Sequence, residues 1–570
     1  MTTEDRLEGA PTQTIPPSLP QRPREFSSQL AIGICCFILS LLFYYCAVLR
    51  IEFKRTDFLD LGPYPDGVEY FAQANSILKE GAPTIQIGYD KLPSRYPPGY
   101  PTLMIPWLTY LPHNGVLAPF RTNQTIGLLL LTGTFILYFV IRSPPLAGGL
   151  ATLLVATQPA FITFCRSSMS DLTGGAVAVL VFALVYLGLA WRRRWLIYCA
   201  AIILGLSLCI RQQLLFLAPL LIAMALFPAN GSRARWFMHC CCTLAAFAAA
   251  ASPYFILNTL QFGHPLKTGY EFWVSDFTDK PIPFSVQNVP GQLRMLWSEV
   301  TATWDEFRVA NLFGTGTYVV PAFILLSTVG LAFVRLRRFE ISALVAGMAY
   351  IFATITYPFV DGRFYIPIFF LLVGLAVLPA QWAVNEALKM RFSMFGFGVL
   401  AVFLLSCIGY PSQSGFKPKG GRSQAWDALQ YVKRNGRSPR YEAQKEFIRS
   451  FRDAPGIVLS DIDPPYLNAL LPKPFVAGPL DGNHNYSYSR RWHYRNAEVL
   501  RLVQSGLDRT IPVYGLLLPS KNADQDIKRL PSIQGYTWER SEKSNSKAVI
   551  MTLTKDTAAS SLDSAFRSVK

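Results

Sequence analysis

A carboxylate and two basic side chains lie within one polar stretch of the sequence, residues 64–101. They are Asp66, Lys91 and Arg95, and the last of these begins a proline-rich turn, RYPPGYP. Prolines fix the backbone there, and glycines let a ligand approach it closely. An acid followed by a short amphipathic helix and such a turn suits a site that holds a group at a membrane surface. The alternative is an interfacial loop whose tyrosines and prolines only anchor it at the headgroup level.

Further polar residues stand at the ends of apolar segments, and the topology below places them on one side of a membrane. They are Arg166, Asp171, Arg211, His264, Tyr270 and Arg363. A charge at a membrane edge costs free energy unless it pairs or serves a site, so this gathering indicates a cavity that opens outward. Each residue also has a simpler interpretation. Arg166 and Asp171 could form a structural pair, and Arg211 could extend along apolar surface towards the headgroups.

The composition indicates that membrane helices carry these residues. Of 570 residues, 51% are apolar and only 16% are charged, which departs from the composition of a soluble globular chain. A helix needs about 20 apolar residues to cross a bilayer. Eleven apolar runs are candidates, near 30–49, 121–141, 146–164, 172–190, 196–210, 213–228, 236–257, 317–334, 341–359, 364–380 and 394–410. The proline-interrupted segment 97–112 is expected to lie at the interface or to insert halfway.

Basic residues predict which loops face the cytoplasm. They fall in five short loops, each two helices from the next, near residues 142, 192–194, 233–235, 335–338 and 389–391. By the positive-inside rule these loops are cytoplasmic, as is the expected flexible tail 1–29, and the first external loop spans 50–120. We therefore expect a multi-pass protein of the inner (plasma) membrane. The net charge of +17 suits anionic lipids, and its scatter over loops argues against nucleic acid as a partner.

A change of composition after residue 410 predicts a second, soluble domain. Residues 30–410 form the transmembrane domain, and residues 411–570, which begin with a Gly-, Lys- and Ser-rich linker, form an extracytoplasmic α/β domain. Helices are expected near 426–432 and 497–504. Strands are expected at 457–459, 513–518 and 548–553.

Several short motifs, taken together, resemble one family. Asp66-Gly67 with the turn RYPPGYP at 95–101 resembles the first external loop of the GT-C fold glycosyltransferases. The nearest group would be the bacterial aminoarabinose transferases and protein O-mannosyltransferases. The segment from Pro159 to Asp171 is similar to that family's second acidic loop, and FGHP at 262–265 and RFYIP at 363–367 are further similarities. The resemblance covers roughly residues 30–380.

This resemblance implies transfer of one sugar from a polyprenyl-phosphate donor to a glycan, lipid or protein acceptor on the outer face, with inversion at the anomeric carbon. Asp66 is the candidate base, and Asp171 would orient the acceptor or Arg166. The departing phosphate needs cations and hydrogen-bond donors. The candidates are Lys91, Arg95, Arg166, Arg211, Arg363 and Tyr365, with Tyr96, His264 and Tyr270 as acceptor or loop residues. Relatives often have Arg-Tyr where this chain has Arg363-Phe364, so a hydroxyl contact would fall to Tyr365.

No cofactor is expected. Members of the fold with two loop acids often use a divalent metal ion, but one Asp in each loop, without Asp-x-Asp, argues against a metal site here. Two other functions fit a membrane chain of this kind. A transporter or flippase of lipid-linked saccharides would have charges near helix midpoints. A non-catalytic assembly protein would use the external domain to recruit partners.

Overall fold

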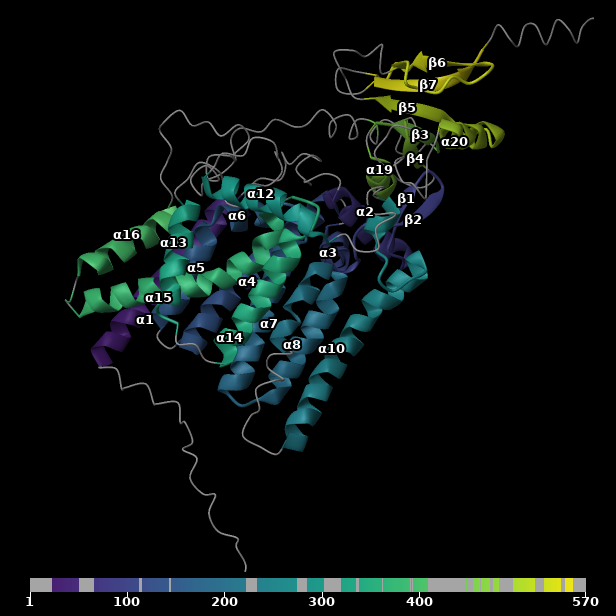
Figure 1. Ribbon diagram of the computed structural model, residues 1–570. Helices are drawn as coiled ribbons and strands as arrows, with labels where there is room; N and C mark the ends of the chain where they lie inside the picture. The colour runs from purple at the N-terminus through teal and green to yellow at the C-terminus, as the bar shows by residue number, and fades with distance from the viewer. Residues whose placement is uncertain are drawn as a thin grey trace, which may run out of the picture.

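The helical part of the molecule extends from residue 23 to residue 408, and a sheet-containing part follows it (Figure 1). The computed structural model describes residues 23–50, 66–111, 115–142, 145–221, 233–273, 284–301, 319–334, 338–360, 362–389, 391, 393–408, 447, 455–461, 463–471, 475–480, 496–517, 527–544 and 549–556. Most of the tail 1–29, the linker after residue 410, the helix expected at 426–432 and Asp361 lie outside the described residues.

The helices of the first part are α1 (Pro23–Tyr44), α2 (Asp66–Glu80), α3 (Gly99–Tyr110), α4 (Ala118–Arg142), α5 (Pro145–Thr157), α6 (Pro159–Cys165), α7 (Asp171–Ala190), α8 (Arg194–Leu206), α10 (Arg233–Phe262), α11 (Gly269–Trp273), α12 (Val289–Thr301), α13 (Val319–Leu331), α14 (Arg338–Ile355), α15 (Ile366–Leu388) and α16 (Met394–Ile408). A π-helix, η1 (Tyr45–Leu49), extends α1. Short 3₁₀ turns are η4 (Gly115–Leu117), η5 (Ser207–Cys209), η6 (Gln212–Leu217), η8 (Val286–Asn288) and η9 (Gly362–Tyr365).

Each of the eleven predicted apolar runs contains helical residues, although the helices differ in length. Within the described ranges, three helices are long and apolar enough to cross a membrane: Phe26–Leu49, Asp171–Ala190 and Trp236–Phe262. The helices Gly362–Phe370 and Leu372–Leu388 meet at a bend of 47° and make a fourth span if they count as one. Six shorter apolar helices accompany them. The number of spans therefore stays a prediction. The proline-rich segment at 97–112 contains α3, a helix of 12 residues with Pro106 inside it.

The second part is built on a five-stranded mixed sheet with strand order β4-β3-β5-β7-β6. Its strands are β3 (Ile457–Ser460), β4 (Val476–Pro479), β5 (Val513–Leu517), β6 (Tyr536–Arg540) and β7 (Val549–Lys555), with helices α19 (Pro464–Leu470) and α20 (Asn496–Asp508). Strand β3 runs parallel to β4 and β5, whereas β7 is antiparallel to β5 and β6. Strands β3, β4 and β5 are buried throughout, which is typical of parallel strands covered on both faces. The strands and the helix expected from the sequence at 457–459, 513–518, 548–553 and 497–504 are all present.

A hairpin formed by residues 84–93 packs against this sheet. Strands β1 (Thr84–Ile87) and β2 (Asp90–Pro93) pair antiparallel, and the backbone N–H of Gly88 donates to the carbonyl of Ala477 in β4 at 2.8 Å. Ile85, Ile87 and Leu92 are buried in the same apolar cluster as the residues of β3 and β5. Figure 1 shows the hairpin and α2 directly beneath the sheet. The core of the second part thus includes side chains from a hairpin of the first part.

Candidate active site

Asp66 is the first residue of α2, where the positive end of the helix dipole favours a carboxylate. Its Oδ2 lies 2.8 Å from Nη1 of Arg363, which belongs to η9, and its Oδ1 accepts a hydrogen bond from the hydroxyl of Tyr96. The Asp66 and Arg363 side chains are 10% and 15% exposed. Because both are largely removed from water, their attraction is stronger than that of a surface pair. Residues 297 positions apart in the sequence therefore meet at one carboxylate.

Asp171 is the corresponding first residue of α7 and is fully buried. One of its oxygens, Oδ1, forms an ion pair with Nη1 of Arg211, a residue in extended conformation just before η6. The other, Oδ2, is buried with no hydrogen-bond partner among the described residues. A buried carboxylate oxygen without a partner costs free energy, so a donor such as a substrate hydroxyl would be stabilising there.

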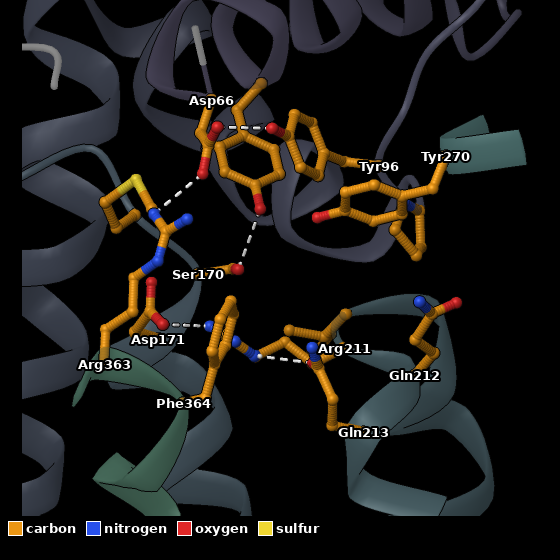
Figure 2. Close-up of a pocket in the computed structure, with 14 residues that line it drawn as sticks. Asp66, Tyr96, Ser170, Asp171, Arg211, Gln212, Gln213, Tyr270, Arg363 and Phe364 are labelled. Carbon is orange, nitrogen blue, oxygen red and sulfur yellow. Dashed lines mark hydrogen bonds and ion pairs between the residues drawn. The ribbon is translucent and has the colours of Figure 1, made fainter. Parts of the chain in front are cut away.

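The two ion pairs lie in one pocket, shown in Figure 2. The hydroxyl of Tyr70 lies 2.9 Å from that of Ser170 and links the two carboxylate-bearing helices. The pocket is lined by Asp66, Tyr70, Tyr96, Pro97, Met169, Ser170, Asp171, Ile210, Arg211, Gln212, Gln213, Tyr270, Arg363 and Phe364. It contains about 30 Å³ of free space, which is room for very few water molecules. A phosphate group can therefore enter only if the side chains that fill the pocket move.

The ring of Phe364 lies beside both arginines. The Cζ atoms of Arg211 and Arg363 are 5.7 and 5.3 Å from its centroid, within the range of a cation–π contact. The face of an aromatic ring attracts a guanidinium and offers it no anion with which to pair. Phe364 thus holds the two cations near each other without neutralising them.

Tyrosine hydroxyls complete the outer side of the pocket. The ring of Tyr96 lies 4.7 Å from that of Tyr70 and 5.7 Å from that of Tyr270, measured between centroids. Burial raises the pKa of all three phenols, so each keeps its proton at neutral pH and can donate a hydrogen bond. α11, which carries Tyr270, begins at Gly269, where any Cβ would overlap the carbonyl oxygen of Ser94. Glycine at this position allows α11 to approach the turn that carries Tyr96.

Arg95 lies behind the pocket and is paired with Glu69. Its Nε is 2.9 Å from Oε1 of Glu69, and its backbone N–H donates to Oε2 at 3.0 Å. The hydroxyl of Ser94 donates to the same oxygen at 3.1 Å. Glu69 is completely buried, and burial raises its pKa. This carboxyl therefore fixes the turn that presents Tyr96 to Asp66, one helical turn from Asp66 itself.

Asn123 has a similar positioning role for Asp171. The side chain of Asn123, in α4, is fully buried and donates to the backbone carbonyls of Phe164, Ser167 and Met169 at 3.1, 2.8 and 2.8 Å. These carbonyls belong to the end of α6 and to the segment between α6 and α7 that leads to Ser170 and Asp171. A single amide thus holds the acidic loop in place. This side chain is also inaccessible to solvent, because it is fully buried.

The structure brings some of the predicted site residues together and places others elsewhere. Asp66, Tyr96, Asp171, Arg211, Tyr270 and Arg363 all line the pocket. Outside the pocket, Lys91 is exposed on the hairpin and pairs with Glu80 at 2.9 Å. The hydroxyl of Tyr365 lies 3.4 Å from Oε1 of Gln292, His264 is exposed, and Arg166 is half-buried without lining the pocket. Within the described ranges, no three His, Cys, Asp or Glu side chains are grouped closely enough to hold a metal ion.

The sequence did not predict a role in the site for Glu69, Asn123, Gln212, Gln213 or Phe364. Glu69 offered one signal, because it lies three residues after Asp66 and therefore on nearly the same face of a predicted helix. Asn123 offered none. An asparagine within an apolar helix is equally consistent with a helix–helix contact.

Comparison with solved structures identifies the architecture. ArnT from Cupriavidus metallidurans, in a structure bound to undecaprenyl phosphate, matches with a TM-score of 0.58 at 12% identity, covering 91% of this chain and 97% of that one. The archaeal oligosaccharyltransferase AglB from Archaeoglobus fulgidus, in complex with an inhibitory peptide and a dolichol-phosphate, matches with a TM-score of 0.52 at 11% identity, covering 93% and 74%. The chain has a GT-C fold. The resemblance drawn from the motifs is thereby confirmed at the level of the fold. No protein-family model and no curated protein sequence matches the chain.

Proposed function

We propose that this protein is a glycosyltransferase that moves a single sugar from a polyprenyl-phosphate donor to an acceptor at the outer face of the membrane. One observation carries the proposal. Two aspartates at helix N-termini and two arginines from distant segments converge in a single buried pocket. The GT-C fold supports it, since the structures with this fold include ArnT bound to undecaprenyl phosphate and AglB in complex with a dolichol-phosphate.

The pocket residues match the needs of an inverting transfer. The hydroxyl oxygen of the acceptor forms a bond to the anomeric carbon, and the bond from that carbon to the phosphate oxygen breaks. The hydroxyl proton passes to Asp66, which acts as the general base. Asp171, with one buried oxygen unpaired, orients the acceptor hydroxyl groups. Polyprenyl phosphate leaves with its negative charge held by Arg211 and Arg363.

Asp66 is the better base because it is the less enclosed of the two carboxylates. It retains some exposure, whereas Asp171 has none. Its hydrogen bond from Tyr96 orients the carboxylate without transferring a proton, because burial raises the pKa of this phenol. Lys91 and Arg95 are not assigned to the phosphate, because each is paired with a glutamate outside the pocket.

The position of the charges distinguishes this function from transport. A flippase would have charged residues near the midpoints of its helices. Here Asp66 and Asp171 each begin a helix, and Arg363 lies in the short turn before α15. The charges thus lie at helix ends. Because the basic loops are expected to face the cytoplasm, we assign the pocket and the sheet-containing domain to the extracytoplasmic side of a multi-pass protein.

The direct test uses purified protein in lipid nanodiscs with a panel of undecaprenyl-phosphate sugars. A detergent extract of the envelope of the producing cells supplies the acceptor, and release of undecaprenyl phosphate is measured. We expect at least one donor to be consumed only when the extract is present. If no donor in the panel is consumed, the proposal is refuted and transport becomes the better explanation.

A further inference from the structure

A second, larger cavity lies between the first external loop and the sheet-containing domain. Its volume is about 730 Å³, within the range of about 300–1,000 Å³ that is usual for ligand sites. One wall is a face of α2, the second is the β1–β2 hairpin, and the third is formed by α19 and the start of β4. It is lined by Ala72, Asn75, Ser76, Lys79, Glu80, Thr84, Gln86, Tyr89, Lys91, Pro465, Asn468, Ala469, Leu471, Phe475 and Val476.

The three walls are fixed relative to one another. The side chain of Asn468 donates to the carbonyl of Gln86 at 2.9 Å and to that of Ala477 at 2.8 Å. Lys79 donates to the carbonyl of Ala469 at 3.3 Å, although these residues are 390 positions apart. The rings of Phe71 and Tyr466 pack against each other below, 5.7 Å between centroids. The cavity is therefore preformed, which lowers the entropic cost of binding.

The lining has the chemistry of a saccharide site. Amides from Asn75 and Gln86 and hydroxyls from Ser76, Thr84 and Tyr89 can both donate and accept hydrogen bonds, as sugar hydroxyls do. Asn75 and Gln86 each use one amide hydrogen on a backbone carbonyl, and Ser76 bonds to Thr84, which leaves the second amide hydrogens, the amide oxygens and the hydroxyl lone pairs for a ligand. The apolar surface of Leu471, Phe475 and Val476 suits the C–H faces of sugar rings. A lipid chain would leave the polar groups unsatisfied. Two ammonium groups against one carboxylate disfavour a cationic ligand.

The helix α2 connects this cavity to the pocket described above. Asp66 and Tyr70 line the pocket, whereas Asn75, Ser76 and Lys79 line the cavity on a different face further along the same helix. At a rise of 1.5 Å per residue, Asp66 and Asn75 are about 14 Å apart along the helix axis. A ligand that extends from the cavity around α2 by more than this distance would bring its far end to Asp66.

We propose that this cavity, named here the α2–hairpin cavity, binds an oligosaccharide segment of the acceptor and so selects the acceptor for transfer. The proposal rests on the glycosyltransferase function proposed above and identifies the class of acceptor. It also gives Lys91 a role, since this side chain lines the α2–hairpin cavity at a distance from the donor phosphate. Its ammonium group suits a saccharide with an anionic substituent.

Asn75→Tyr tests the proposal by filling the α2–hairpin cavity from one wall. The matched control is Leu78→Tyr, which places the same side chain at an exposed position of the same helix that lines neither cavity. The probes are a donor consumed by the wild type and a dilution series of envelope extract. We expect Asn75→Tyr to raise the apparent KM for the extract about tenfold, equivalent to loss of one or two hydrogen bonds. The kcat and the donor KM should stay within about twofold of the wild type, a change too small to represent a lost hydrogen bond. Leu78→Tyr should change none of these.

Lys91→Ala provides a second variant, because Lys91 is exposed and its removal leaves the core intact. It should raise the KM for the extract and leave the donor KM unchanged. An increase in the donor KM alone would overturn the proposal and place Lys91 with the donor phosphate. So would a wild-type KM for the extract in both variants, or an equal effect of Leu78→Tyr.

Chemical treatment of the extract tests the class of ligand. Periodate cleaves vicinal diols and should abolish acceptor capacity, whereas protease digestion should preserve it. The opposite pattern would indicate a peptide acceptor and refute a saccharide site. Failure of the wild type to consume any donor would instead refute the glycosyltransferase function, so the two failures are distinguishable.

Discussion

Replacing Asp66 with asparagine separates two roles that the pocket gives to this side chain. Asparagine keeps the size of aspartate and can still accept the hydrogen bond from Tyr96, but it cannot take a proton from the acceptor. General base catalysis usually contributes about 10²–10⁴-fold to the rate. We therefore expect kcat to fall by about 10²-fold or more.

The same substitution releases Arg363 from its ion pair. Two unit charges about 4 Å apart attract each other by about 4 kcal/mol at an effective dielectric constant of about 20. Part of this attraction must be given up when Arg363 turns to the donor phosphate. If a third of it is given up, the neutral asparagine strengthens donor binding by about 1.4 kcal/mol, or tenfold. Asp66→Asn should thus bind the donor as tightly as the wild type or up to about tenfold more tightly.

The assay measures kcat from release of undecaprenyl phosphate at saturating donor and extract, and donor Kd by calorimetry without extract. Asp90→Asn is the matched control, because Asp90 is exposed on the hairpin and lines neither cavity. If the Asp66→Asn protein folds and keeps the wild-type kcat, Asp66 is not the base and Asp171 becomes the candidate. Weaker donor binding would refute the competition between Asp66 and the phosphate, and loss of folding would make Asp66 a structural residue.

Three further predictions concern charge and topology. Arg211→Ala should raise the donor KM, lower kcat and lower the melting temperature, because it leaves Asp171 buried and unpaired at a cost of about 3–5 kcal/mol; an unchanged melting temperature would contradict this. Burial raises the pKa of Glu69, so the folded protein holds this proton more tightly than the unfolded chain, and stability should fall as pH rises between the ordinary and the raised pKa. Glu69→Gln should flatten that part of the curve of melting temperature against pH, and a curve identical to the wild type would refute the assignment. In a variant without its ten native cysteines, a cysteine at Arg193 should be shielded from an impermeant thiol reagent in intact cells and one at Glu539 labelled; the reverse pattern would invert the topology.

The positions of the helices could be predicted from the sequence because the bilayer imposes a strong constraint on composition. Every apolar run contains helical residues, and the strands at 457–459, 513–518 and 548–553 follow from short β-branched and apolar segments. Strands β4 and β6 and the β1–β2 hairpin were not predicted. The hairpin strands are only four residues each, and its apolar face is limited to Ile85, Ile87 and Leu92, too short a pattern to predict a strand from the sequence. It is stabilised by its contacts with β4 and α19, which are almost 400 residues away in the sequence.

The sequence predicted which residues would line the pocket better than it predicted which acids and bases would form ion pairs. Asp66, Asp171, Arg211 and Arg363 stood out because charges at the ends of apolar helices need a reason. The sequence offered Arg166 as a partner for Asp171 by proximity, whereas the folded chain gives Asp171 to Arg211, 40 positions away. Arg95 was grouped with the phosphate ligands because it is basic and begins a proline-rich turn. Its actual partner, Glu69, became evident only when α2 and the turn were placed together.

The charge balance of the pocket suggests why two arginines are present. With two aspartates and two arginines, the side chains of the pocket carry no net charge. A polyprenyl-phosphate sugar is a phosphodiester with one negative charge, and the departing phosphate monoester carries close to two near neutral pH. In the proposed transfer, the second charge develops only as the bond to the sugar breaks, while the proton that Asp66 accepts removes its attraction for Arg363. Arg363 then becomes available to the phosphate at the moment when the extra charge appears. Interactions that strengthen in the transition state accelerate a reaction, whereas those already complete with bound substrate do not.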